Sequence, residues 1–370
     1  MANSIQGMRL YYDIIKTARE NGKEFDEDIK DEILSKLVPD EKTIKEINRY
    51  MDGYAAEELF RRIYCQLPWI KVITPLGQEQ YPEKSKESLQ VPDYKVVYEV
   101  QDEEHTETIL VEVKLVNGDK ETFKLQKYKF AVLKKYAIES HMPFVFAIYW
   151  KEKRIWTINH IDAFSEKNSQ YKLSFSVACK NDLSAIFGDY TYIFKKNIYR
   201  KSIYEYEQKK SENKYYIHEK YGAARYEALS VDDINYEEVS VLETAMLDSC
   251  FDFSNDKIIE DETELTLIES SKDRHYIYKL SSILMAYLQK IHCYNNEDMF
   301  CEINDIVSNA FNIVDTVRRY CGGERYYSLP NKHSIVVDEL IKKQFGNTHI
   351  YDDYMNIDIE DNQTLLCRHI

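Results

Sequence analysis

Glycine and proline are scarce in this 370-residue chain, which has ten glycines and seven prolines. Neither a GxGxxG nor a GxxxxGK[ST] pattern occurs, so the chain lacks the usual dinucleotide-binding and P-loop signatures. Its seven cysteines are scattered, odd in number and without a CxxC pair. This cysteine pattern argues against a disulfide framework and against a zinc ribbon or finger.

Long apolar runs are absent as well. No stretch approaches the roughly 18 uninterrupted apolar residues of a membrane helix, and the N-terminal MANSIQGMRLYYDIIK has charges where a signal peptide needs an apolar run. We therefore expect a cytoplasmic protein with no membrane partner. Hydrophobic residues make up 44% and charged residues 31% of the chain, as in globular proteins, and the length suits two domains.

The net charge of −15 is spread unevenly along the chain. Residues 231–270 hold thirteen carboxylates and one lysine, whereas 114–135 and 195–225 are rich in lysine and arginine. A uniformly acidic protein would repel nucleic acid. The basic segments restrict a nucleic-acid partner to particular faces without excluding one.

Hydrophobic periodicity and β-branched runs divide the chain into three predicted parts. Residues 1–50 are expected to form an N-terminal helical segment, in which Asp40 is a predicted N-cap for a helix over 41–52. Residues 51–165 and 166–370 are expected to form an α/β mixed-sheet core and a mainly helical C-terminal domain. The core has predicted helices at 53–67 and 122–140 and strands at 71–74, 96–100, 108–116, 143–150 and 154–161. The C-terminal part has predicted helices at 275–294, 300–320 and 333–345.

Three charged residues lie in or just before the predicted hairpin of 96–100 and 108–116. In the apolar run ILVEVKLV, Glu112 and Lys114 share one face of the strand, because side chains alternate. Asp93 precedes the neighbouring strand, and antiparallel pairing would place it beside Glu112. Buried charges are costly unless they are paired or bind a metal. The two carboxylates and the Val113 carbonyl make an all-oxygen set of the kind that Mg²⁺ prefers.

The PD dipeptide at 92–93 and the EVK tripeptide at 112–114 resemble the motif of the PD-(D/E)xK nuclease superfamily. Restriction-endonuclease-like and Holliday-junction-resolvase-like members are the nearest in pattern. The resemblance covers residues 53–162 and implies an α-β-β-β-α-β core. It implies that Asp93, Glu112 and the Val113 carbonyl bind Mg²⁺, for which Mn²⁺ would substitute. Lys114 would then assist the attacking water and stabilise charge on the phosphate.

Residues on the two flanking helices resemble further members of the family's site. Glu57, with Glu58 as the alternative, matches the acidic residue that completes the metal shell. Gln126 matches a glutamine that would orient the lysine or contact phosphate. Four lysines follow the EVK run, where contacts with DNA phosphates would be wanted: Lys120, Lys124, Lys127 and Lys129.

Each of these residues also has a plainer structural interpretation. Asp93 could begin a turn, and Glu112 and Lys114 could form a solvated ion pair on an edge strand. Glu57 could be a first-turn acid favoured by the helix dipole. Gln126 and the lysines that follow the EVK run could be exposed residues that only solubilise a helix.

These observations favour a Mg²⁺-dependent nuclease that hydrolyses DNA, expected to be an endonuclease of restriction or anti-phage defence. Residues 166–370 would then supply recognition, regulation, or contacts with a second copy or a partner protein. One alternative is a catalytically silent scaffold of the nuclease fold that binds nucleic acid or protein. Another is a latent nuclease whose acidic 231–270 segment mimics nucleic acid until a partner or ligand releases it.

Overall fold

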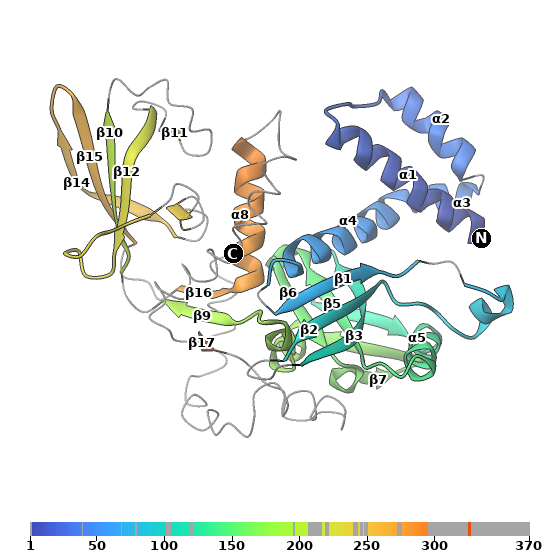
Figure 1. Ribbon diagram of the computed structural model, residues 1–370. Coiled ribbons are helices and arrows are strands. Elements are labelled where there is room, and N and C mark those ends of the chain that lie inside the picture. The colour runs from blue at the N-terminus through green and yellow to red at the C-terminus, as the bar shows by residue number, and fades with distance from the viewer. Residues whose placement is uncertain are drawn as a thin grey trace, which may run out of the picture. The chain divides into compact units, whose positions relative to one another are not determined.

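The computed structural model describes residues 2–294 and 325–326, except 39, 68, 78–79, 101–104, 119–120, 195–196, 206–216, 219–221, 240–242, 245–246, 248–250 and 272–275. These residues divide into two compact units, which meet in sequence between Gly188 and Asp189 (Figure 1). Over the part of the chain so described, no helix is long and apolar enough to cross a membrane.

The first unit begins with four helices: α1 (Ala2–Glu20), α2 (Glu27–Leu37), α3 (Glu41–Ile44) and α4 (Ile47–Tyr64). Asp40 caps α3 as predicted, because its side chain accepts from the backbone N–H groups of Lys42 and Thr43. The predicted break between 41–52 and 53–67 is wrong, since α4 runs through Gly53 without interruption. A glycine costs a helix interior only about 1 kcal/mol, and tertiary packing overrides that cost.

A mixed five-stranded sheet forms the centre of the first unit, which confirms the predicted mixed α/β sheet. Its order is β1-β2-β3-β5-β6, with β3 and β5 parallel and the other pairs antiparallel. The strands are β1 (Ile70–Pro75), β2 (Tyr94–Glu99), β3 (Thr106–Val116), β5 (Phe144–Trp150) and β6 (Ile155–Asn159). All but one of the β5 residues are buried, as its continuous apolar sequence predicts.

Two helices cover opposite faces of this sheet. Phe60 of α4 contacts Trp156 of β6, and Trp156 stacks on its cross-strand neighbour Tyr149. Phe130 of α5 (Lys127–Glu139) contacts Phe146 of β5. Because Phe146 and Tyr149 are three residues apart on one strand, they point to opposite faces. The core therefore has two apolar layers, and α4 and α5 lie on different sides (Figure 1).

The helix predicted over 122–140 is wrong in its first five residues, which form strand β4 (Thr122–Gln126). Phe123 and Leu125 are buried while Lys124 and Gln126 are exposed, so the period of two belongs to a strand. The partners of β4 form a three-stranded sheet, β4-β8-β7, with β7 (Ser165–Lys167) and β8 (Gln170–Ser174).

The first unit continues to Gly188, beyond the predicted domain end at 165. Helix α6 (Phe175–Lys180) is tied to the main sheet, because Asn159 donates from Nδ2 to the carbonyls of Ala178 and Asn181. Short 3₁₀ helices complete this unit: η1 (Glu83–Glu87), η2 (Lys151–Lys153), η3 (Ile161–Ala163) and η4 (Ser184–Phe187).

The second unit contains two antiparallel sheets and the helix α8 among its described residues. The larger sheet has the order β11-β12-β10-β15-β14, with β13 beside β12, and the smaller one has the order β16-β9-β17. Its elements are β9 (Thr191–Phe194), β10 (Tyr199–Glu205), β11 (Ile217–His218), β12 (Gly222–Ser230), β13 (Glu237–Glu238), β14 (Phe253–Glu260), β15 (Glu264–Ser271), β16 (Tyr276–Lys279), α8 (Leu280–Tyr294) and β17 (Arg325–Tyr326).

A mainly helical C-terminal domain is therefore the wrong prediction for these residues. Several buried positions of the larger sheet are polar, so apolar periodicity gives little sign of its strands. Arg200, for example, is buried, pairs with Glu269 at 2.7 Å and lies 4.4 Å from the Phe253 ring centroid. The helix predicted over 275–294 begins only at Leu280. The helices predicted over 300–320 and 333–345 lie outside the described residues.

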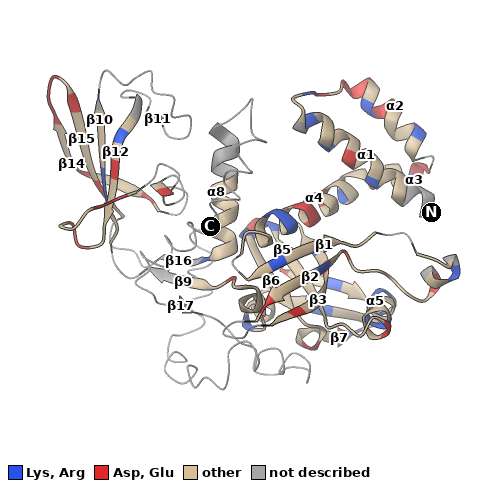
Figure 2. Ribbon diagram, viewed as in Figure 1, with Lys and Arg blue, Asp and Glu red and all other residues tan. Residues whose placement is uncertain are grey.

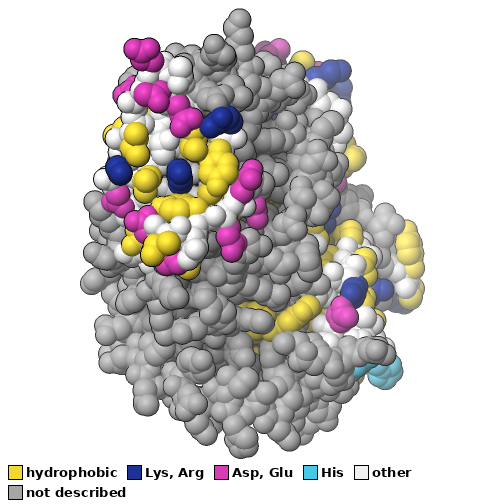
Figure 3. All heavy atoms as spheres, turned by 60° about the vertical axis from the view of Figure 1, so that its left-hand side comes forward, with side chains coloured by type: hydrophobic (Ala, Val, Ile, Leu, Met, Phe, Trp, Pro, Cys, Tyr) yellow, Lys and Arg dark blue, Asp and Glu magenta, His cyan; other side chains and the backbone are white. Residues whose placement is uncertain are grey.

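The surface of the larger sheet mixes acidic and apolar side chains. Figure 2 shows acidic residues on β14 and β15, which belong to the acidic segment 231–270. Ile258 and Ile259 of β14 are exposed. In Figure 3, hydrophobic side chains gather on the face of this unit that comes forward, with acidic side chains around them.

Candidate active site

Asp93 lies between β1 and β3 at the start of β2. Strands β2 and β3 pair antiparallel with Tyr94 opposite Val111, so the next position along brings Asp93 beside Glu112, as the sequence predicts. The Val113 backbone N–H donates to Asp93 Oδ2 at 2.7 Å. The Asp93 carbonyl accepts from the Leu76 backbone N–H at 2.9 Å. The carboxylate is thus held on β3 and does not merely begin a turn.

Glu112 and Lys114 lie on one face of β3 and contact each other. Lys114 Nζ donates to Glu112 Oε1 at 2.6 Å and to the Val113 carbonyl at 2.8 Å. Glu112 is 2% exposed, and β3 lies between β2 and β5. A solvated ion pair on an edge strand therefore does not describe these two residues.

The carboxylate pair carries more negative charge than its surroundings compensate. Burial raises the pKa of Asp93, although Lys114 and the Val113 hydrogen bond oppose the shift. Burial and the nearby charge of Asp93 raise the pKa of Glu112 to about 7, with Lys114 again opposing. Glu112 Oε2 is buried and has no hydrogen-bond partner among the described residues. An added cation at this oxygen would relieve both the repulsion and the missing contact.

Glu57 of α4 interacts electrostatically with Asp93 and Lys114, but its carboxylate forms an ion pair with Arg9. Arg9 of α1 contacts Glu57 Oε2 through Nη1 at 2.6 Å, and the Glu57 carbonyl accepts from the Tyr94 hydroxyl at 3.0 Å. Burial and the charge of Asp93 raise the pKa of Glu57 to about 8, against the effects of Arg9 and Lys114. Glu57 therefore lies close enough to the site to interact with Asp93 and Lys114 while its carboxylate is paired with Arg9.

Glu58, the alternative acid, has a separate set of cationic partners. Its Oε1 lies 3.0 Å from Lys16 Nζ and 3.0 Å from Arg62 Nε, and Arg61 also donates to it. Burial raises the pKa of Glu58, but the hydrogen bonds from Arg61 and Lys16 outweigh burial and bring the pKa down to about 2. The negative charge of Glu58 is thus already balanced by these cations, and Glu57 is the better candidate for the metal shell.

The oxygen atoms of the site fit one hard cation better than a complete three-acid cage. No group of three or more His, Cys, Asp or Glu side chains among the described residues is arranged to hold a metal ion. Mg²⁺ usually takes one or two carboxylates and fills its remaining positions with water and substrate phosphate. Asp93 and Glu112 meet that requirement together with the Val113 carbonyl, since Glu112 Oε2 has no hydrogen-bond partner in the part of the chain that the structure describes.

The remaining predicted residues are more peripheral. Gln126 is exposed at the end of β4, and its side chain does not cap α5. Lys124 is exposed on β4 opposite Lys172, and Lys127 pairs with Glu166. Lys120 lies outside the described residues.

Lys129 is the described lysine of the predicted set with an electrostatic connection to the site. Partial burial and the charges of Lys114 and Arg49 lower its pKa, while Glu112 and Glu46 oppose the shift. Arg49 was not predicted as a site residue, and neither was Arg9. Both belong to a helical region whose sequence shows only amphipathic spacing, so no local signal marks them.

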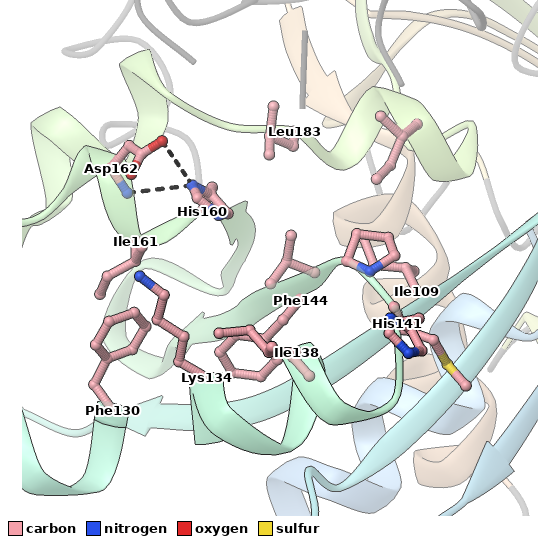
Figure 4. A pocket seen from close by; sticks show the side chains of 15 residues that line it. Ile109, Phe130, Lys134, Ile138, His141, Phe144, His160, Ile161, Asp162 and Leu183 are labelled. Carbon is pink, nitrogen blue, oxygen red and sulfur yellow. Dashed lines mark hydrogen bonds and ion pairs between the residues drawn. The ribbon is translucent and has the colours of Figure 1, made fainter. Parts of the chain in front are cut away.

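A separate apolar pocket of about 460 Å³ lies beside α5 and contains none of the predicted site residues (Figure 4). Its few polar side chains are Lys134, His141, His160 and Asp162. His160 Nδ1 lies 3.0 Å from Asp162, and Figure 4 shows this pair with Lys134 on the other side of the hollow.

The raised pKa of Glu112 predicts a pH-dependent stability difference. The folded-state pKa of Glu112 is about 7, above the ordinary 4.5. The contribution of protonated Glu112 to the stability of the fold is therefore complete below pH 4.5 and is lost as pH rises through 7. Without metal, Glu112→Gln should therefore gain about 1–3 kcal/mol relative to the wild type between pH 5 and pH 8. Urea unfolding in EDTA at both pH values measures the difference. Parallel pH profiles for the two proteins would contradict the prediction.

Comparisons with known proteins leave the family open. No family model matches the chain, and no curated protein matches it. Among solved structures, it is similar to a Holliday junction resolvase from the archaeal hyperthermophile Archaeoglobus fulgidus. The two share 14% identity with a TM-score of 0.27, over 37% of this chain and 96% of that chain.

Proposed function

We propose that this chain is a divalent-metal-dependent nuclease that hydrolyses DNA phosphodiester bonds. Asp93 and Glu112 would bind Mg²⁺ or Mn²⁺, together with the Val113 carbonyl. The observation that carries the proposal is the partly buried Asp93 and the buried Glu112 beside Lys114, with Glu112 Oε2 left without a partner among the residues described. A buried arrangement with surplus negative charge is costly unless a cation completes it.

Lys114 is suited to stabilising negative charge on the scissile phosphate. Burial lowers the pKa of Lys114, but the charges of Glu112 and Asp93 outweigh burial and raise it. The Lys114 side chain is therefore a protonated ammonium, which would act as a positioned cation and hydrogen-bond donor. Such a group contributes by stabilising charge that develops in the transition state.

The bound cation would supply Lewis-acid polarisation of the phosphate and a more acidic water. Asp93 and Glu112 would hold the cation, and a water would attack phosphorus in line with the O3′ leaving group. The new bond would join the water oxygen to phosphorus, and the P–O3′ bond would break. The water would lose a proton to solvent and O3′ would take one from solvent, leaving a 5′-phosphate and a 3′-hydroxyl. Glu57 would accept a hydrogen bond from a metal-bound water or bind the metal directly.

The remaining sequence-based roles extend this proposal. Gln126, Lys120, Lys124, Lys127 and Lys129 would contact DNA phosphates, with Gln126 an alternative partner for Lys114. The second unit would recognise the target, a second copy or a partner protein, and restriction or phage defence would be the setting. A silent scaffold is the weaker alternative, because Asp93, Glu112 and Lys114 are all present: Lys114 contacts Glu112, and the Val113 backbone between them holds Asp93.

Incubation with supercoiled plasmid tests the proposed function. The wild type is expected to nick or linearise the plasmid with Mg²⁺ or Mn²⁺ and to stop when EDTA removes the metal. Asp93→Ala should lose both cleavage and Mn²⁺ binding, since it removes one of two carboxylates from the cation site. Lys71→Ala is the control, because Lys71 forms an exposed ion pair with Glu99 on the same sheet. Cleavage that persists in EDTA, or Mn²⁺ binding that survives in Asp93→Ala, would contradict the proposed site. A wild type that neither cuts nor binds Mn²⁺ would favour the scaffold.

A further inference from the structure

Arg9 is brought to the site by a helix that packs tightly on its neighbours. Met8 and Tyr11 of α1 are buried with Tyr54 of α4 in one apolar cluster. A Cβ at Gly7 would lie 1.9 Å from the Leu37 carbonyl oxygen, so α1 approaches the end of α2 as closely as a glycine allows. The position of Arg9 relative to α4 is therefore determined by packing, and not by the ion pair alone.

The Arg9 guanidinium lies between an aromatic ring and two acids. Its carbon is 4.9 Å from the Tyr54 ring centroid. Its Nη1 lies 2.6 Å from Glu57 Oε2, and its Nε lies 3.5 Å from Asp13. The Arg9 side chain is 39% exposed, whereas that of Glu57 is 20% exposed. Arg9 is thus a half-exposed cation held against the acid that interacts with Asp93.

In this arrangement Arg9 and a divalent cation would compete for Glu57. Glu57 Oε2 is occupied by the Arg9 guanidinium. The positive charge of Arg9 beside the carboxylates also weakens the binding of a metal cation by direct repulsion. A phosphate group, in contrast, is a strong partner for a guanidinium, which it contacts with two parallel hydrogen bonds. The affinities for DNA and for the metal would therefore both rise if Arg9 moved from Glu57 to a phosphate.

We propose that Arg9 is an exchange counterion, which holds Glu57 until DNA arrives and then moves to a phosphate, releasing Glu57 towards the metal site. The inference rests on the proposed nuclease function and adds to it a coupling between DNA binding and metal binding. Such coupling is reciprocal: each ligand raises the affinity of the other by the same factor. Arg9 is a positioning residue for Glu57 in the free chain and a substrate-binding residue in the complex.

Metal binding without DNA gives the first test. Arg9→Gln is expected to bind Mn²⁺ about tenfold more tightly than the wild type, within the usual range for coupled sites, as measured by calorimetric titration of the full chain. Lys16→Gln is the matched control, because it removes one cation from the same helix at Glu58 and should leave the affinity unchanged. Unchanged or weaker Mn²⁺ binding by Arg9→Gln, with or without a lower melting temperature, would overturn the exchange and leave Arg9 a structural role.

DNA binding in EDTA gives the second test, since no cleavage then interferes. Anisotropy of a labelled duplex at one fixed salt concentration would compare the wild type, Glu57→Gln, Arg9→Gln and the double variant. Glu57→Gln should bind DNA about fivefold to tenfold more tightly than the wild type because it frees Arg9. The same Glu57→Gln change made in Arg9→Gln should give no increase over Arg9→Gln alone. A gain that persists in the double variant would come from lost carboxylate repulsion alone and would overturn the inference.

The two tests separate this inference from the proposed function. If the wild type binds no Mn²⁺, or if Asp93→Ala binds it equally well, the metal site is wrong and the role of Arg9 falls with it. If Mn²⁺ binds at Asp93 but Arg9→Gln has wild-type affinity, the nuclease proposal stands and the exchange alone is wrong.

Discussion

Replacing Lys114 with alanine is expected to lower the rate of DNA cleavage by about 100-fold or more while Mn²⁺ binding is retained. Loss of one positioned donor to a transition-state charge typically costs a factor of about 10²–10³. Lys114 is also the cation that contacts Glu112 at 2.6 Å. Its removal therefore leaves more negative charge for a metal, so Mn²⁺ affinity should stay equal or increase.

Single-turnover cleavage of a plasmid and calorimetric Mn²⁺ titration measure the two quantities separately. Lys71→Ala again removes one lysine from the same sheet at an exposed ion pair and should change neither. If Lys114→Ala lowered cleavage less than about tenfold, Lys114 would not stabilise the transition state as proposed. If it abolished Mn²⁺ binding, its role would be to hold the carboxylates in place.

Replacing Phe60 with alanine is expected to reduce the free energy of unfolding of the first unit by about 3–5 kcal/mol, the usual cost of truncating a buried phenylalanine. Phe60 is 0% exposed. Its ring centroid lies 4.5 Å from that of Tyr64, 5.6 Å from that of Tyr94 and 5.7 Å from that of Trp156. The cavity would therefore open between the sheet and α4, the helix that also carries Glu57.

Urea unfolding followed by tryptophan fluorescence measures this loss, because Trp156 belongs to the same cluster. Tyr128→Ala is the matched aromatic control: Tyr128 is 63% exposed on α5, and its loss should stay within about 0.5 kcal/mol. A cost below about 1 kcal/mol for Phe60→Ala would show that α4 does not depend on this contact.

The strands of the first unit were largely predictable because their burial follows simple periodicity. Residues 144–150 are apolar throughout and all but one are buried, and the β-branched sequences of β2 and β3 are separated by a short polar stretch of sequence. Strand β4 was missed because five residues before a helix read as an extension of that helix. Its alternation of buried Phe123 and Leu125 with exposed Lys124 and Gln126 is the period of two that indicates a strand.

The second unit shows where such periodicity stops helping. Arg200, Ser202 and Glu227 are buried in strands β10 and β12, so inward positions are polar and the strands do not alternate between apolar and polar residues. A buried polar group is tolerated when it finds a partner, as Arg200 does with Glu269. Those partners lie on strands far apart in the sequence, and only the folded chain brings them together.

The sequence by itself determined the core of the site. In a hairpin, the register is local, and the alternation of ILVEVKLV required Glu112 and Lys114 to share a face with Asp93 next to them. Only the tertiary structure decided which acid of α4 interacts with Asp93, and that Arg9 holds it from 48 residues away. The rotation of a helix and the docking of a distant segment depend on packing across the whole unit, which no local pattern encodes.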